Sequence, residues 1–310
     1  MQPLSKSLAI LLSFVFTTTM SLSQIPKVSL GNIQRFENMS SAFVAARTVD
    51  VWLPDGYDAN KKYAVLYMQD GNALFDSTIM WNHQEWGVDE VLTKLIAEKR
   101  IKDCIVVGIW NGGASRHSEY FPQKPFESLT ESQQTYLYSA KRNNGDIYFS
   151  EKVQSDKYLQ FLVTELKPFI DKNFATLKDR DNTFIAGSSM GGLISMYAIC
   201  EYPNIFAGAA CMSTHWVGIS ETANNPVPAA FMQYLQHHLP LPQYHKIYFD
   251  YGSETLDALY KPFQLQADAI MQQKGYNATN WLTKEFVGAD HSENAWNKRF
   301  EIPVSFLLGK

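Results

Sequence analysis

The sequence of 310 residues predicts one α/β domain built on a mostly parallel sheet. Short apolar runs typical of buried strands alternate with longer runs of helical periodicity, the order expected of a parallel sheet wrapped by helices. One strand-like run leads through a Gly-x-Ser-x-Gly pattern, Gly187 to Gly191, into a helix-like run. From Lys27 onward no linker, repeat or low-complexity tract divides the chain, so a single domain accounts for all of it.

The first 23 residues have the features of an export signal. Lys6 supplies a positive charge, residues 8–22 are apolar or small, and Ser21-Leu22-Ser23 is a small-x-small cleavage site. A membrane anchor is the alternative, but three threonines interrupt the apolar run, which is short for a span. We expect a mature domain of residues 24–310 that is secreted or periplasmic and free of the membrane once the signal is removed.

Composition and charge favour a substrate bound in a pocket. The chain is 45% hydrophobic and 19% charged, with an aromatic fraction of 14% and a net charge of −4. This negative balance gives no electrostatic reason to expect a nucleic acid or an anionic membrane as partner. Cys104, Cys200 and Cys211 lie in apolar runs without metal-ligand spacing. We expect them to be buried, we expect neither a metal nor a cofactor, and the oligomeric state is left open.

The N-terminal half of the domain predicts three strands and one helix. Residues 43–54 form a β-rich run that ends at a proline. Residues 62–68 form a near-continuous apolar run, typical of a strand covered on both faces, and lead into a glycine-containing loop. A helix is expected over 88–98, followed by a strand over 104–109.

Residues 114–154 have the least regular pattern and are rich in Tyr, Phe, Pro, Ser and Gln. A connection of this length is commonly functional, and its aromatic content predicts a packed, cap-like insertion over a site. After it the alternation resumes. We expect a helix over 156–174, a strand before Ser189 and a helix after it, strands over 207–212, 246–251 and 281–286, and helices over 257–274 and near Ile302.

In this context the Gly187 to Gly191 pattern predicts a nucleophile elbow with Ser189 at its tip. A serine on a sharp strand-to-helix turn needs a strained backbone and very small neighbours, which the two glycines supply. The pattern alone also occurs by chance in loops, but the flanking runs favour the elbow. Ser188 is then a small neighbour, and Ser189 is the expected nucleophile of acyl transfer.

A nucleophilic serine needs a base, and among seven histidines His291 has the expected place in the chain. In elbow hydrolases the order is Ser, acid, His, with the histidine in the loop after the last strand, and residues 288–296 form such a loop. His291 would take the serine proton and later give it to the leaving alcohol. His237 and His238 lie in a helix-like segment, where a solvated face is expected rather than a metal site.

Two carboxylates follow the strand that ends near Tyr251, and either can orient the histidine. Asp257 is favoured, Glu254 is the alternative, and a dyad without an acid is the third option. Asp290 is adjacent to His291 in the chain, so its side chain is poorly placed to reach the Nδ1 atom. The acid would fix the imidazole tautomer and stabilise the imidazolium.

The oxyanion of acyl transfer requires hydrogen-bond donors that are already in place. The backbone N–H of Met190 is one candidate, because it follows the nucleophile at the start of a helix. The second is expected from the loop after the 62–68 strand, where Asn72 is the natural candidate.

Four segments together resemble the esterase D-like branch of the α/β-hydrolases, namely residues 63–75, 187–192, 252–257 and 290–296. That branch includes feruloyl and acetyl esterases, S-formylglutathione hydrolases, enterochelin-type siderophore esterases and mycolyltransferases. The resemblance covers about residues 30–308 and implies an α/β-hydrolase fold with Ser189 as nucleophile and His291 as base. Feruloyl-esterase-like members carry their acid in a Gly-Thr-Asn-Asp type of loop; this sequence has Gly-Ser-Glu-Thr at 252–255, with Asp257 two positions later.

Aromatic residues in loops that are expected to face the strand ends indicate a substrate with sugar or phenolic rings, with ordinary packing as the alternative for each. These residues are Trp81, Trp86, Trp110, Tyr120, His215 and Trp216. Arg116 is a candidate for binding a substrate carboxylate, with pairing to Glu119 as its alternative.

These features lead to the hypothesis of an exported serine carboxylic-ester hydrolase that removes acetyl or feruloyl groups from carbohydrate. Its substrate would be a small-molecule or oligosaccharide ester. One alternative is a siderophore or other small-ester hydrolase with the same mechanism. The other is a non-catalytic, carbohydrate-binding relative.

Overall fold

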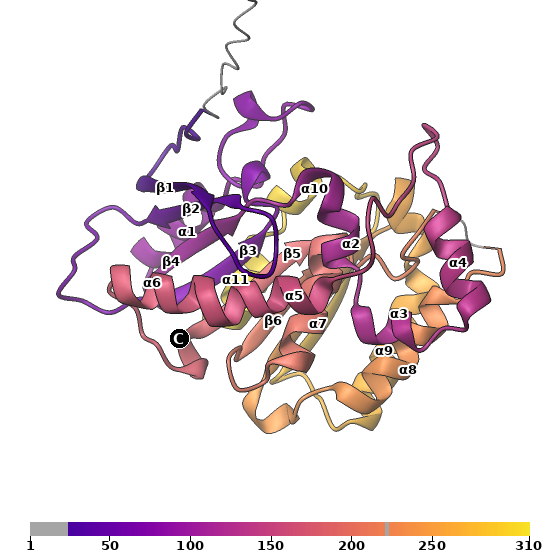
Figure 1. Ribbon diagram of the computed structural model, residues 1–310. Coiled ribbons are helices and arrows are strands. Elements are labelled where there is room, and N and C mark those ends of the chain that lie inside the picture. Colours follow the sequence, from indigo (N-terminus) through magenta and orange to yellow (C-terminus); the bar gives the residue numbers. More distant parts are fainter. Residues whose placement is uncertain (1–23, 221–222) are drawn as a thin grey trace, which may run out of the picture.

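The computed structural model describes residues 24–220 and 223–310, and the expected signal segment lies outside these ranges. The described residues form an eight-stranded sheet with helices on both faces (Figure 1). The spatial order of the strands is β1-β2-β4-β3-β5-β6-β7-β8. Their bounds are β1 (Asn32–Met39), β2 (Arg47–Leu53), β3 (Ala64–Gln69), β4 (Cys104–Ile109), β5 (Thr183–Ser188), β6 (Gly208–Met212), β7 (Lys246–Gly252) and β8 (Trp281–Phe286).

The sheet is mostly parallel, as the sequence predicts. Neighbouring strands pair in parallel from β4 through β3, β5, β6 and β7 to β8, while β2 is antiparallel to both of its neighbours. The carboxyl ends of the six parallel strands therefore meet at one edge of the sheet. The loops that follow β3, β5, β6, β7 and β8 meet there, and they carry Asn72, Ser189, Ser213, Asp257 and His291.

Successive side chains of the central strands enter two different cores. In β3, Val65 and Tyr67 belong to one buried cluster, while Leu66 and Met68 belong to the other. This alternation is the period of two of a strand, and it explains why a doubly covered strand has a continuous apolar sequence.

Helices α2 to α9 contribute to the first core, and α1, α10 and α11 cover the opposite face (Figure 1). A π-helical turn, Phe161–Leu166, joins α5 to α6, so the helix expected over 156–174 is one helical run with this irregularity. The bounds are α1 (Val88–Ala97), α2 (Arg116–Tyr120), α3 (Gln123–Glu127), α4 (Glu131–Ser139), α5 (Ser155–Gln160), α6 (Lys167–Asn173), α7 (Met190–Glu201), α8 (Val227–His238), α9 (Lys261–Gln273), α10 (Glu293–Asn297) and α11 (Glu301–Leu308).

The sequence did not predict β1 or the helices α2 to α4. Strand β1 lies at the edge of the sheet and is half-exposed, so its residues carry no apolar pattern. Helices α2 and α3 contain five residues each, too few to show a helical period. Their aromatic residues, such as Tyr120 and Phe126, pack into the first core.

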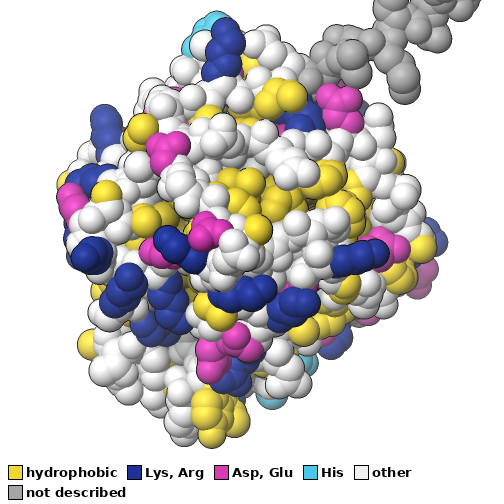
Figure 2. All heavy atoms as spheres, turned by 90° about the vertical axis from the view of Figure 1, so that its left-hand side faces the viewer, with side chains coloured by type: hydrophobic (Ala, Val, Ile, Leu, Met, Phe, Trp, Pro, Cys, Tyr) yellow, Lys and Arg dark blue, Asp and Glu magenta, His cyan; other side chains and the backbone are white. Residues whose placement is uncertain are grey.

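One face of the molecule carries charged side chains of both signs, and the cysteines are placed as the sequence predicts. On the face that carries β1 and α6, basic and acidic side chains are interspersed (Figure 2). The three cysteines are buried and free, as expected. Within the described ranges, no helix has both the length and the apolar character needed to cross a bilayer.

Candidate active site

Ser189 occupies the sharp turn between β5 and α7, as the elbow prediction requires. Its backbone has φ 56° and ψ −122°, a strained conformation for a residue with a side chain. A Cβ atom added to Gly187 would lie 2.6 Å from the backbone carbon of Gly191, so the turn leaves no space for a larger residue there. The Ser189 N–H donates to the carbonyl oxygen of Met212 at 2.9 Å, which fixes the turn to β6.

The loop after β8 brings His291 to the acid that follows β7. The Nδ1 atom of His291 lies 2.5 Å from Oδ1 of Asp257, which is fully buried. Burial by itself would raise the pKa of Asp257, but hydrogen bonds from His291, Ser213 and the Gly252 N–H outweigh it and lower that pKa below its usual value. The carboxylate therefore stays ionised and can hold the imidazole with its Nε2 atom free for a second partner.

The structure brings Asp257, rather than Glu254 or Asp290, to the histidine. Glu254 is exposed, and its carboxylate accepts a hydrogen bond from Ser253 Oγ at 3.1 Å. Asp290 accepts from Ser292 Oγ at 2.6 Å, as expected of a carboxylate that cannot turn back to its neighbour.

Ser213 connects Asp257 to two further residues that the sequence analysis missed. Trp296 Nε1 and Arg299 Nη2 both lie within hydrogen-bond distance of Ser213 Oγ, at 2.9 and 2.8 Å. Both groups can only donate, so Ser213 Oγ must accept from them and direct its own proton to Asp257 Oδ2, at 2.6 Å. Arg299 also pairs with the buried carboxylate of Asp250 at 2.9 Å. The direction of every proton around Asp257 is therefore determined.

His215 lies on the other side of Ser189, in the loop after β6. Its backbone N–H donates to the carbonyl oxygen of Ser189 at 3.2 Å, and its Nδ1 atom lies 2.6 Å from the hydroxyl of Tyr260. Burial, with smaller effects of His291 and Arg116, lowers the pKa of His215 to about 3, so the ring is neutral at pH 7. His215 contacts the elbow from inside the protein and is not a surface platform for substrate.

Ser189 and His291 line the same cleft, whose volume is about 490 Å³. The cleft also includes Asn72, the candidate for the second oxyanion donor, and Trp81, whose side chain is 88% exposed. The complete lining is Asp70, Asn72, Ala73, Met80, Trp81, Asn82, Gln84, Trp86, Asn111, Arg116, Ser188, Ser189, His291, Ser292, Glu293 and Trp296. Arg116 is the residue of the 114–154 insertion that lines this cleft.

Arg116 lies in the cleft but is paired differently from the alternative that the sequence suggested. It binds both carboxylate oxygens of Asp70, at 2.6 and 2.7 Å, and Asp70 also accepts from Asn111 at 2.7 Å. Glu119 instead forms a buried ion pair with Arg47 at 2.7 Å. The guanidinium is thus held in place by a fixed carboxylate while it borders the cleft.

Besides His215, three of the proposed aromatic contacts are not among the residues that line the cleft. The indole N–H of Trp110 donates to Asp50 at 2.8 Å, and Trp216 is fully buried with its N–H on Gln264 at 2.9 Å. Tyr120 is fully buried and lies under the guanidinium of Arg116, 5.1 Å from ring centroid to Cζ. Tyr120 and Trp216 therefore pack inside the protein, and the half-buried Trp110 is bonded to Asp50, which corrects the expectation that these rings face a substrate.

One of the residues that the sequence analysis did not identify, Arg299, could have been inferred from a feature of the sequence. Asp250 is a charged residue within the otherwise apolar run of β7, and a carboxylate in a buried strand requires a cationic partner. That partner is Arg299. Ser213, Tyr260 and Trp296 are of types that occur throughout the chain, and nothing in their spacing distinguishes them.

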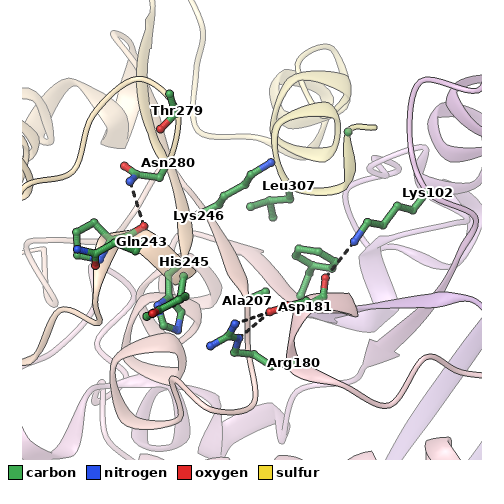
Figure 3. A pocket seen from close by; sticks show the side chains of 14 residues that line it. Lys102, Arg180, Asp181, Ala207, Gln243, His245, Lys246, Thr279, Asn280 and Leu307 are labelled. Carbon is green, nitrogen blue, oxygen red and sulfur yellow. Dashed lines mark hydrogen bonds and ion pairs between the residues drawn. The ribbon is translucent and has the colours of Figure 1, made fainter.

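A second cavity, of about 590 Å³, lies at the opposite edge of the sheet, where β5 and β7 begin (Figure 3). It is larger than the cleft and is lined by Lys102, Arg180 and Lys246. Neither Ser189 nor His291 is among the residues that line it. Among the described residues no group of three or more His, Cys, Asp or Glu side chains is placed to hold a metal ion.

Residues 40–304 match the model of a family described as "Putative esterase". The chain belongs to this esterase family. It is thereby a serine carboxylic-ester hydrolase, the enzyme class expected from its sequence.

Two curated relatives are similar to this esterase along much of its length. A protein of Bacillus subtilis named "Uncharacterized protein YbbA" is 22% identical over 85% of this chain and 93% of its own. An "Endo-1,4-beta-xylanase/feruloyl esterase" of Xylanibacter ruminicola is 28% identical over 58% of this chain and 21% of its own.

Solved structures share the fold of this esterase. A ferulic acid esterase of Anaeromyces mucronatus superposes with a TM-score of 0.61 at 19% identity, over 91% of this chain and 92% of that one. An IroE-like serine hydrolase of Shewanella oneidensis superposes with a TM-score of 0.64 at 16% identity, over 89% of this chain and 80% of that one. The enterobactin hydrolase IroE superposes with a TM-score of 0.57 at 17% identity, over 92% of this chain and 98% of that one. The expected α/β-hydrolase fold is confirmed.

Replacing the acid of the esterase distinguishes its two candidates. Asp257→Asn should lower kcat for a short ester by roughly 10⁴-fold, because an amide at this position favours the wrong imidazole tautomer. Glu254→Gln is the matched control and should leave kcat unchanged, since the Glu254 side chain is exposed and bonds Ser253 rather than His291. Steady-state hydrolysis of p-nitrophenyl acetate measures both, and equal losses in the two variants would contradict the assignment.

The buried His215 makes the stability of the esterase depend on pH. In the unfolded chain a histidine titrates near its usual pKa of about 6.5, whereas the pKa of folded His215 is about 3. Between these values the unfolded chain binds the extra proton, so stability falls as the pH falls. From pH 6.5 to pH 5 the wild type should lose about 2 kcal/mol more than His215→Gln in urea unfolding. Identical pH profiles would refute the claim that His215 stays neutral.

Proposed function

We propose that this esterase is exported and hydrolyses acyl esters of carbohydrate through Ser189, His291 and Asp257. The observation that carries the proposal is the hydrogen bond from His291 to Asp257, in the same cleft as a serine on a strained strand-to-helix turn. A solvated surface histidine would have no reason to contact a fully buried carboxylate. Export rests on the features of residues 1–23.

In the proposed mechanism Ser189 Oγ attacks the ester carbonyl carbon while His291 Nε2 takes the serine proton. The tetrahedral intermediate breaks its bond to the alcohol oxygen, which receives that proton from His291 and leaves. Water then attacks the acyl-enzyme with His291 again as base, and the acid is released. The Met190 N–H at the start of α7 and Asn72 in the loop after β3 are the proposed donors to the oxyanion.

The composition of the cleft supports a carbohydrate ester as substrate. Asn82, Gln84 and Asn111 add amide side chains that can hydrogen-bond hydroxyl groups. Trp81 exposes its ring at the cleft, where a sugar or a phenolic acyl group can stack. A relative whose name includes feruloyl esterase supports the same class of substrate.

A siderophore ester is the second candidate, and Arg116 is the observation that favours it. A cationic side chain at the cleft suits a ligand with negative charge, and an enterobactin hydrolase has the same fold. Release of acetate or ferulate from xylan fragments, measured beside cleavage of a ferric siderophore, decides between the two. The substrate with the higher kcat/KM identifies the function.

Covalent labelling separates an active esterase from a carbohydrate-binding relative without activity. A fluorophosphonate probe should label the wild type and should fail to label Ser189→Ala, because the phosphorus atom bonds to the activated oxygen. Ser188→Ala is the matched control, since this neighbouring serine lies at the end of β5 and should not react. A wild type that is neither labelled nor able to hydrolyse p-nitrophenyl esters would refute the enzymatic proposal.

Removing the exposed ring at the cleft should affect large substrates and spare small ones. Trp81→Ala should lower kcat/KM for a feruloylated oligosaccharide about three- to tenfold, the usual contribution of a stacked aromatic pair, and leave p-nitrophenyl acetate unaffected. Tyr244→Ala removes an exposed ring beside the second cavity and serves as the control. Equal effects of Trp81→Ala on both substrates would show that Trp81 supports the loop and does not bind substrate.

A further inference from the structure

The second cavity lies at the edge of the sheet opposite to Ser189, and two lysines enter it from different segments of the chain. Lys102 is located two residues before β4, and Lys246 is the first residue of β7. Their side chains extend into the cavity from opposite sides (Figure 3). The cavity, of about 590 Å³, therefore has an ammonium group on each of two walls.

Neither ammonium group has a carboxylate partner among the described residues. Lys102 Nζ donates to the carbonyl oxygen of Asp181 at 3.1 Å and to Oδ1 of Asn182 at 2.9 Å. Lys246 Nζ donates to the carbonyl oxygen of Phe306 at 3.1 Å. All of these acceptors are neutral oxygens. Because an ammonium group has three N–H donors, one N–H of Lys102 and two of Lys246 remain for a ligand.

The surroundings of Lys246 make its charge costly without a counter-ion. Its side chain is half-buried, and its Nζ atom lies 5.6 Å from the ring centroid of Phe306. Burial, with a smaller effect of Lys102, lowers the pKa of Lys246 below its usual value. An anion between the two ammonium groups would offset both their repulsion and the loss of hydration.

The other charged groups of the lining leave the cavity positive. The Asp181 carboxylate is bound by Arg180 at 2.6 Å, so it balances that guanidinium rather than either lysine. Both ring nitrogens of the buried His245 face carbonyl oxygens, 2.9 Å from Leu241 and 2.8 Å from Pro203. A neutral imidazole can donate from one nitrogen only, so forming both bonds adds a further positive charge. Because the whole chain has a net charge of −4, its composition does not account for this positive lining.

The arrangement of the lysines favours a tetrahedral oxyanion over a carboxylate. A guanidinium matches the planar fork of a carboxylate with two parallel hydrogen bonds, but the Arg180 guanidinium already binds Asp181. An ammonium group is a point charge, and two of them on different walls match oxygens that project in different directions from a doubly charged group. The cavity has the volume of a typical ligand site, so such a group can be carried on a sugar-sized molecule.

We propose that the second cavity binds a phosphate or sulfate group between the ammonium groups of Lys102 and Lys246. The group is either a free ion or an ester on a sugar, and the lysines recognise the same oxygens in both. This inference goes beyond the proposed function and does not depend on it, because neither Ser189 nor His291 lines the second cavity.

Isothermal titration calorimetry of the whole protein at pH 7 and constant ionic strength tests the proposal with sulfate, inorganic phosphate, glucose 6-phosphate and glucuronate. We expect saturable binding of sulfate or phosphate, and weaker binding of glucuronate, which carries a single charge. Lys102→Gln and Lys246→Gln should each weaken binding about tenfold, the effect of one hydrogen bond to a charged group. Tighter binding of glucose 6-phosphate than of inorganic phosphate identifies a sugar ester as the ligand, and equal or weaker binding identifies the free ion.

The matched control is Lys261→Gln, which removes one positive charge at a lysine paired with Glu285 at 2.8 Å, outside the lining of the second cavity. It should bind each probe as the wild type does, and circular dichroism should show that all three variants are folded. A loss as large as that of Lys246→Gln overturns the inference, because the net charge of the protein would then attract the anion.

Three further results would also overturn the inference. They are no binding of sulfate or phosphate to the wild type at about 10 mM, binding that both lysine substitutions leave unchanged, and glucuronate bound as tightly as phosphate. None of these results affects the proposed function, which the hydrolysis of p-nitrophenyl esters tests separately.

Discussion

The backbone of Ser189 is the constraint on which the site depends. A residue with φ 56° is stable here only because Gly187 and Gly191 leave room for the turn and because β6 holds it by hydrogen bonds. The Ser189 N–H donates to Met212, and the Ser189 carbonyl accepts from His215. Strand β6 and the loop after it therefore hold the elbow at both of its peptide groups. The loop after β6 also places Ser213 against Asp257 and His215 against Tyr260. This one loop therefore both holds the strained turn and positions the residues around it.

Groups that can only donate set the proton directions around the elbow. Trp296 and Arg299 leave Ser213 no choice but to donate to Asp257, and the ionised Asp257 leaves His291 no choice but to present Nδ1–H to it. The Nε2 atom of His291 is then an acceptor without any adjustment by the substrate. Because these groups are buried, water cannot compete for their hydrogen bonds, and the arrangement is maintained at low cost once the chain has folded.

The sequence could predict those parts of the structure that depend on local pattern. Strands β4 and β8 have the bounds expected from the sequence, and the elbow follows from glycine spacing and its flanks. The residues of the site were harder to predict where their contacts join distant parts of the chain. Ser213 and Asp257 are 44 residues apart, and no spacing rule connects them. Trp216 was misplaced for a related reason, because a tryptophan in a loop and one in a core look alike until the fold shows which space the ring fills.

The residues of the cleft that perform the reaction and those that can contact the substrate come from different segments of the chain. Ser189 and His291 are fixed by buried partners on the strand ends, whereas Trp81, Asn82 and Gln84 belong to the segment between β3 and α1. Arg116 differs from these residues, because Asp70 and Asn111 immobilise it and two of its guanidinium nitrogens are already bonded. A cation whose charge is largely balanced by its neighbour attracts an anion only weakly, yet its remaining N–H groups still donate to neutral oxygens. The positive charge of Arg116 taken alone suits an anionic siderophore, but its pairing with Asp70 favours hydroxyl and carbonyl oxygens over carboxylates at this position, and therefore an acylated sugar.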